Sequence, residues 1–465
     1  LELNIESDLS GIKVDAPVPF TKKSEEKLPF QMSVKKTRDL RIGFRYGELA
    51  NGVMALEKGA LKRGQVYLGT TQTFLPSDEG LSITGNIPHE INAKDWWDFW
   101  HKIKPEVSEG EAKNKSAVLT HIDLSVPEVN SWQQMMGPSH IVGDYKWNQW
   151  NFTLDSELMK GEIVLPDDLV QYAITMDLEY IHMPVVENHP NKGLKFGAAE
   201  TIDPLQEFDP KWIPNTDLKV AEVFLGTSNF GRWNMTMRQQ EEFTRIHIND
   251  SLSKSLVVKG DIDWRKDEQG HNTHLNLMRI QSKNLGDSQR AFRKAASVEA
   301  EKSKFDVDLS WQGSPAGFNY ASLNGLAKVS LKDGVLVSDN AGALKAFGVL
   351  NFNSISRRLQ LDFSDLYESG VVFDVLKTRL SIENGVATFA DPLWIDGPSA
   401  KFQSSGTVNF NNDEIDQKLV VTFPITSSLP LVAVLAGLAP QIAGAIYVTE
   451  KLIGEELEQF TSASY

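Results

Sequence analysis

Apolar and polar residues alternate with a period of two through most of this chain. Phe305, Val307 and Leu309 alternate with acidic residues, and the same pattern recurs over 256–265 and 376–383. Successive side chains of a β-strand point to opposite faces, so each of these segments has an apolar face and a polar face. The sequence therefore predicts a mainly β protein built on an elongated antiparallel sheet with one dry face.

Short polar segments separate the predicted strands. Asn and Asp followed by Gly accept the positive φ angles of a two-residue hairpin. We therefore expect a turn at Asn51-Gly52 and hairpins at Asp333-Gly334 and Asn384-Gly385. After the polar turn at 267–272, Leu275 and Leu277 are expected to resume the apolar face.

Three segments depart from this period. Asn92 is a suitable cap for a helix through Ile103, in which aromatic residues lie at helical spacing. A second helix is expected over Leu285–Ala300, with Asp287 or Ser288 as its cap. The uncharged run Leu429–Val448 is interrupted by prolines, which predicts two short apolar helices or one kinked helix.

The amino-acid composition argues against several kinds of ligand and catalytic site. The 62 acidic and 47 basic residues give a net charge of −15, which argues against nucleic-acid binding. The chain has no cysteine, which excludes disulfides, thiolate metal sites and a cysteine nucleophile. His271 and His274 form an H-x-x-H pair without a carboxylate in helical register, so we expect an exposed polar turn and no metal site. We predict no cofactor and no enzymatic activity.

The alternation is compatible with two arrangements. In a closed sandwich the apolar faces of the strands meet, whereas in a curled sheet they line a hydrophobic groove. Both arrangements require the same sequence pattern, so the alternation by itself leaves them open.

Motifs in the last third of the chain resemble a known family. The segment 350–367 (LNFNSISRRLQLDFSDLY), the Glu-Asn-Gly turn at 383–385, the run 395–400 (IDGPSA) and the run 427–437 resemble the C-terminal region of the AsmA-like family. The resemblance is to the large envelope proteins of the YhdP type within this family. It is most specific over 313–465.

The resemblance implies a groove-shaped sheet that transfers phospholipid between the inner and outer membranes of a Gram-negative envelope. It implies a periplasmic location, with the longer protein anchored in the inner membrane by an N-terminal segment absent from this sequence. Acyl chains gain about 0.8 kcal/mol per buried CH₂, so a groove needs a continuous apolar lining. The predicted lining residues are Leu256, Val258, Ile262, Trp264, Phe305, Val307, Leu309, Leu359, Leu361 and Phe363.

The resemblance also organises the chain into three expected parts: the first part of the groove over 1–282, an AsmA-like β-region over 283–428 and an apolar helical end over 429–465. The last part either caps the sheet or contacts a membrane through Leu431, Val434, Leu435, Leu438 and Ile442. A second hypothesis is a periplasmic scaffold that assists assembly of outer-membrane proteins, with an outer-membrane or periplasmic protein as its partner. A third is an enzyme on envelope polysaccharide, which requires carboxylates that meet in one cleft.

Overall fold

The structure is a computed structural model of the 465-residue chain. It describes residues 2–464 except 37–38, 104–118, 132–133, 184–202, 204, 227, 254–255, 292–297, 337–370, 399, 413 and 425–459. The chain divides into two compact units, Leu1–Met183 with Asn215–Val223, and Pro184–Pro214 with Phe224–Tyr465. Both units are mainly β, as the alternation predicts. The three-part division at 282 and 428 stays a prediction.

The first unit contains one main sheet and one small sheet. Its main strands are β1 (Glu2–Ser7), β2 (Phe30–Lys36), β3 (Leu40–Tyr46), β4 (Ala50–Glu57), β5 (Ala60–Leu68), β6 (Gly80–Asn86), β8 (Leu119–Val126), β11 (Ser139–Lys146), β12 (Gln149–Ser156), β13 (Met159–Pro166) and β14 (Ile174–Met183). They pair in this order, antiparallel except where β6 lies parallel to both β5 and β8. The small sheet contains β7 (Ile91–Asn92), β9 (Val129–Ser131) and β10 (Gln134–Met135).

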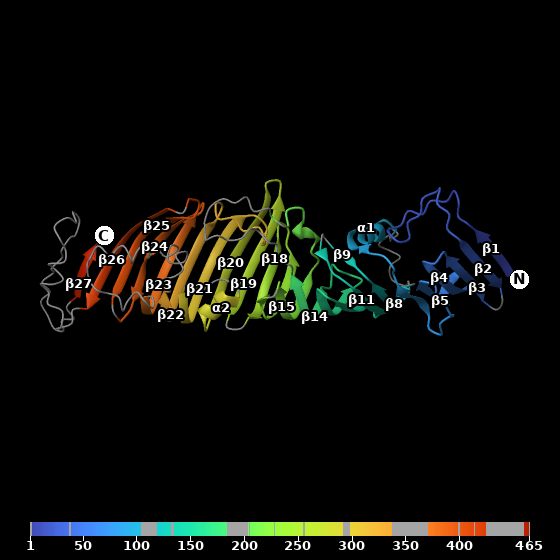
Figure 1. Ribbon diagram of the computed structural model, residues 1–465, viewed down its shortest axis with the longest axis horizontal. Helices are drawn as coiled ribbons and strands as arrows, with labels where there is room; N and C mark the ends of the chain where they lie inside the picture. Colours follow the sequence, from blue (N-terminus) through green and yellow to red (C-terminus); the bar gives the residue numbers. More distant parts are fainter. Residues whose placement is uncertain are drawn as a thin grey trace. The chain divides into compact units, whose positions relative to one another are not determined.

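Strand β15 (Thr216–Leu225) begins in the first unit and ends in the second, where β16 (Ser228–Asn229) pairs with its last residues. The longer strands of the second unit are β17 (Arg232–Gln239), β18 (Thr244–Leu252), β19 (Leu256–Asp267), β20 (Gly270–Ser282), β21 (Val298–Gln312), β22 (Asn324–Leu336), β23 (Val371–Glu383), β24 (Val386–Asp396), β25 (Lys401–Asn409), β26 (Glu414–Pro424) and β27 (Phe460–Ser464). Each of these pairs antiparallel with the next, so chain order is also spatial order (Figure 1).

The first predicted helix is confirmed. Helix α1 (Ala93–Ile103) follows β7, and the Asn92 side chain accepts hydrogen bonds from the backbone N–H groups of Lys94 and Asp95, at 3.0 and 3.4 Å. Asn92 thereby partners two of the amide groups that a helix start leaves unbonded.

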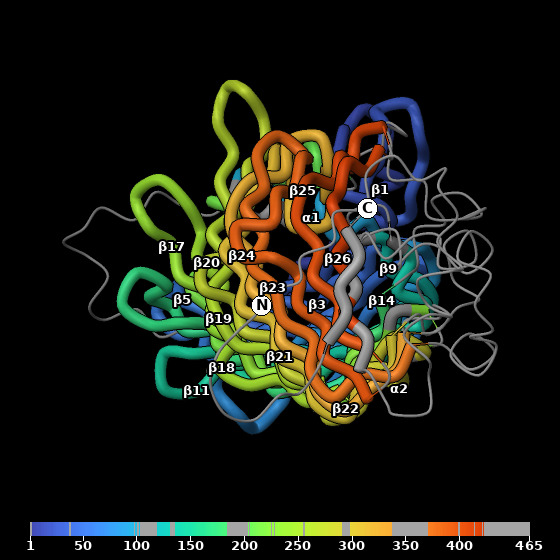
Figure 2. Tube along the Cα trace, turned by 90° about the vertical axis from the view of Figure 1, so that its left-hand side faces the viewer, coloured from blue at the N-terminus to red at the C-terminus, as the bar shows by residue number. Residues whose placement is uncertain are grey.

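The second predicted helix is correct in place but wrong in length and cap. Helix α2 spans Leu285–Ala291, and Asn284 caps it by accepting a 3.0 Å hydrogen bond from the Asp287 N–H. Val298 and Ala300 belong to β21, where they are buried. The helix contacts β21 and lies at the ends of β21 and β22 in both views (Figures 1 and 2). The sequence around Val298 and Ala300 has a helical pattern, but the burial of these residues in β21 outweighs that local preference.

The polar turn within 267–272 is confirmed between β19 and β20. Of the three turns predicted at Asn-Gly or Asp-Gly pairs, one is confirmed. Asn384 and Gly385 have φ angles of 47° and 75° and join β23 to β24. Asp333-Gly334 instead lies inside β22, and Asn51-Gly52 lies inside β4, so both of these turn predictions are wrong. A Cβ on Gly334 would lie 2.5 Å from the Phe373 ring, and one on Gly52 would clash with the Phe44 ring. At these two positions glycine makes room for a neighbouring ring and does not turn the chain.

The described residues form helices α1 and α2 and a 3₁₀ helix over Pro210–Trp212, and none of the three is long and apolar enough to span a membrane. The predicted apolar segment 429–448 lies outside the described residues.

Candidate functional site

Strands β19–β22 of the second unit share an apolar face. Pairing places Val258 of β19 opposite Ile280 of β20, Ile280 opposite Phe305 of β21, and Phe305 opposite Val329 of β22. Residues opposite each other in adjacent strands lie on the same face of a sheet. A row of aliphatic and aromatic side chains therefore crosses four strands.

Two further rows run beside this one. Ile262, Leu275 and Leu309 lie opposite one another on β19, β20 and β21. Met278 of β20 lies opposite Val307 of β21, which in turn faces Ala327 of β22. Seven of the lining residues predicted from sequence thus lie on one face, which we call the apolar face. They are Leu256, Val258, Ile262, Trp264, Phe305, Val307 and Leu309.

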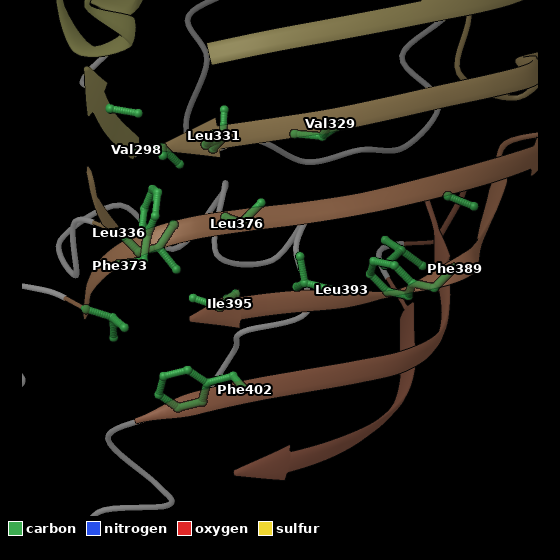
Figure 3. Close-up of a cluster of buried hydrophobic side chains, with 14 of the residues drawn as sticks. Val298, Val329, Leu331, Leu336, Phe373, Leu376, Phe389, Leu393, Ile395 and Phe402 are labelled. Carbon is green, nitrogen blue, oxygen red and sulfur yellow. The ribbon is translucent and has the colours of Figure 1, made fainter. Parts of the chain in front are cut away.

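Burial differs along this face. On β22, β23 and β24, Leu331, Leu376 and Ile395 are all 0% exposed and pack with Phe402 of β25 (Figure 3). Of the predicted lining residues on β19 and β21, all but Trp264 are only half-buried. Met278 of β20 and Trp311 of β21 are 3% and 5% exposed. The apolar face is therefore a closely packed core over β22–β25 and combines buried with half-buried apolar side chains over β19–β21.

The opposite face of the same strands is polar and paired. Arg245 and Asp263 join β18 to β19, His274 and Asp308 join β20 to β21, and Arg379 and Asp391 join β23 to β24. On β20 and β21, Arg279 lies 2.8 Å from Asp306, and the cations Arg279 and Lys304 hold the pKa of the Asp306 carboxyl below its usual value. Cross-strand ion pairs of this kind keep the polar face in water and the apolar face turned away from it.

Trp264 lies on the apolar face but differs from its neighbours. It is 4% exposed, its ring stacks on Phe208 at 5.6 Å between centroids, and its Nε1 donates a 3.1 Å hydrogen bond to His271 Nδ1. Its indole is thus covered by the loop that carries Phe208.

The remaining predicted site residues lie outside the described residues. These are the lining residues Leu359, Leu361 and Phe363 and the membrane-contact residues Leu431, Val434, Leu435, Leu438 and Ile442.

The H-x-x-H pair is not an exposed turn, contrary to the sequence-based expectation. His271 is buried beside Trp264, whereas His274 points to the polar face and contacts Asp308 at 2.8 Å. The two histidines belong to opposite faces and do not converge on one ion. Among the described residues, no group of three or more His, Asp or Glu side chains is arranged to hold a metal.

Sequence analysis missed part of the apolar face because β20 contains a bulge. Leu277 has a φ of 47° and is 78% exposed, and the pairing with both neighbouring strands shifts register there. The extra residue turns Leu277 outward and brings Met278 and Ile280 to the apolar face, so the expectation for Leu277 is wrong. Ile246 and Ile248 of β18 also lie on the apolar face, and simple alternation in the sequence is enough to assign them to it.

The fold and this face define a mainly β protein with a two-faced antiparallel sheet. The family model described as YhdP protein matches residues 1–465, and the chain belongs to this family. It is 21% identical over 469 residues to the intermembrane phospholipid transporter YhdP of Escherichia coli strain K12. The match covers 98% of this chain and 35% of that relative, so the chain spans about a third of the relative's length. No solved structure matches the chain.

Proposed function

We propose that this chain carries phospholipid, with acyl chains held against the half-buried part of the apolar face. The observation that carries the proposal is the half-buried row across β19–β21, in which Val258, Ile280 and Phe305 follow one another without a polar side chain between them. The half-buried row of Ile262, Leu275 and Leu309 lies on the same face. An acyl chain laid on this surface gains about 0.8 kcal/mol for each CH₂ removed from water. The similarity to a phospholipid transporter supports the same function.

In this proposal the sheet curls so that β19–β21 line a groove, while the paired polar face stays in water. The route joins the inner and outer membranes of a Gram-negative envelope, and the chain lies in the periplasm as part of a longer, inner-membrane-anchored protein. Headgroups stay at the water-exposed edge, because burying a charged phosphate without partners costs several kcal/mol. Binding and release of the apolar chains suffice for transport, and no bond is made or broken.

The first test is lipid content. The chain is purified without detergent, and organic extracts are quantified by mass spectrometry. We expect about one or more phospholipids per protein, falling at least tenfold in Val307→Glu, because the new carboxylate lies in the middle of the apolar rows. Val372→Glu is the matched control, since Val372 is on the polar face of β23 and 46% exposed. This variant should keep its lipid.

A second measurement covers the case in which Val307→Glu does not fold. A phospholipid with a photoreactive acyl chain is incubated with the unaltered chain, and adducts are mapped by peptide sequencing. Adducts at Phe305 or Val307 support the proposal, whereas adducts confined to the polar face around Val372 contradict it. A lipid-free protein whose sheet edge crosslinks to outer-membrane proteins favours the scaffold hypothesis instead.

A further inference from the structure

A hollow of about 520 Å³ opens across strands β18–β22, and most of its polar lining belongs to the polar face. Its charged lining is entirely basic and comes from Lys283, Lys302, Lys304 and Lys332. Gln281 and Ser330 add an amide and a hydroxyl group to this lining. In a chain with a net charge of −15, four lysines around one hollow are a local reversal of charge.

Two of these lysines are brought together by an irregularity in the sheet. In β21 the buried positions change from even numbers, ending at Ala300, to odd numbers, starting at Ser303. In β22 the matching change falls beside Asp333, whose φ is 53°. Each change leaves two consecutive residues pointing to the polar face. Lys302 in β21 and Lys332 in β22 are among these residues, and strand pairing places the two lysines directly opposite each other.

Like charges directly opposite in a sheet are destabilising. Cations also lie opposite each other elsewhere on the polar face, as Lys259 with Arg279 and Lys328 with Arg379. In those pairs one of the two cations contacts a carboxylate, Asp306 for Arg279 and Asp391 for Arg379. Lys302 and Lys332 form no ion pair with any described residue, and the same holds for Lys283.

The fourth lysine is not fully neutralised either. Lys304 lies 2.8 Å from Asp306, but this carboxylate also receives a 2.8 Å hydrogen bond from Arg279. The single negative charge of Asp306 is therefore shared between Lys304 and Arg279. Lys377 of β23 extends the basic region, since it is exposed and lies opposite Ser330.

We propose that this hollow, which we call the lysine hollow, binds a phosphate-bearing anion. A phosphate accepts charge-assisted hydrogen bonds from several ammonium groups at once, and its charge converts the repulsion between Lys302 and Lys332 into shared attraction. Ser330 and Gln281 supply neutral hydrogen-bonding groups beside them. The hollow is larger than a single phosphate ion and has room for a phosphate ester such as a lipid headgroup. The lysines of the hollow lie on the opposite face from the acyl-chain surface, although Ser282 and Ser303 of its lining adjoin that surface beside Leu256. This inference does not rest on the proposed function.

The test measures binding by isothermal titration at constant ionic strength. The probes are inorganic phosphate, glycerol 3-phosphate, and vesicles of phosphatidylglycerol or phosphatidylcholine. We expect at least a tenfold weaker affinity in the double variant K302Q/K332Q and an unchanged affinity in K160Q. Lys160 is a suitable control because it lies in the first unit and pairs with Asp155 and Glu179.

The four probes distinguish a free phosphate group from a lipid headgroup as the ligand. Binding of inorganic phosphate or glycerol 3-phosphate supports a site for a free phosphate group, and binding of phosphatidylglycerol vesicles alone supports a lipid headgroup. The absence of binding to any of the four probes overturns the proposal, as does equal affinity in the double variant. Val307→Glu should retain glycerol 3-phosphate binding, so a failure of the acyl-chain proposal is distinguishable.

Stability provides an independent readout. If the lysine pair is retained for binding, then K302Q in phosphate-free buffer should raise the melting temperature by relieving the repulsion, while added phosphate should stabilise the unaltered chain more than K302Q. A melting temperature that falls in K302Q, with no stabilisation of the unaltered chain by phosphate, would assign the lysines a purely structural role. K283Q extends the test to a lysine outside the opposed pair.

Discussion

Arg245 and Asp263 face each other across β18 and β19, and the guanidinium donates hydrogen bonds of 2.7 Å from Nε and Nη2 to the two carboxylate oxygens. The Arg245 guanidinium also lies 5.2 Å from the centre of the Phe243 ring. The hydrogen bonds to Asp263 raise the pKa of Arg245 above its usual value. The Asp263 side chain is only 14% exposed, so this pair is the most enclosed Arg–carboxylate contact described on the polar face.

Replacing Arg245 by Met should destabilise the fold by about 1–3 kcal/mol, because Asp263 loses both donors while it stays largely shielded from water. Urea unfolding followed by tryptophan fluorescence measures the change. Arg232→Met is the control, since Arg232 and Asp250 are both well exposed and such a pair contributes at most about 1 kcal/mol. Equal shifts in the two variants would show that enclosure of the carboxylate is not what matters.

Gly334→Ala should destabilise the second unit by about 1–3 kcal/mol through overpacking. A Cβ at this position would lie 2.5 Å from the Phe373 ring and would also clash with the Glu299 carbonyl oxygen. Gly43→Ala is a milder control, because its nearest contact is the rotatable Ser33 hydroxyl at 3.0 Å. Thermal unfolding compares the two variants. Adding Phe373→Leu should restore only part of the loss, since the backbone clash remains, and full restoration would contradict this account.

Tyr145 should titrate abnormally at high pH. Burial, together with the hydrogen bond that its hydroxyl donates to Asp167, raises the pKa of Tyr145 to about 12. An unfolded tyrosine titrates near 10, so the stabilisation from this group is complete below about pH 10 and is lost as the pH rises towards 12. The absorbance titration of the unaltered chain minus that of Tyr145→Phe isolates this group. A midpoint near 10 in the difference curve would rule out the shift.

The two-residue alternation determined much of the fold, because a strand has its two faces fixed by backbone geometry alone. Phe305, Val307 and Leu309 were assignable to one face of one strand from their spacing, and pairing confirms it. The cap of α1 at Asn92 was equally local, since its side chain bonds amides two and three residues away. The amino-acid sequence by itself therefore determined the faces of strand segments with unbroken alternation, and the start of one helix.

Tertiary structure decided the positions where local signals are ambiguous. Asn384-Gly385 turns the chain, whereas Asp333-Gly334 continues through β22 because the Phe373 ring of the next strand occupies the space beside Gly334. Trp264 is enclosed by Phe208, more than fifty residues away in the sequence. Lys302 and Lys332 became neighbours only through register. Whether these positions turn the chain, become buried or face another charge depends on side chains from distant segments. Those side chains take their places only when the whole sheet packs.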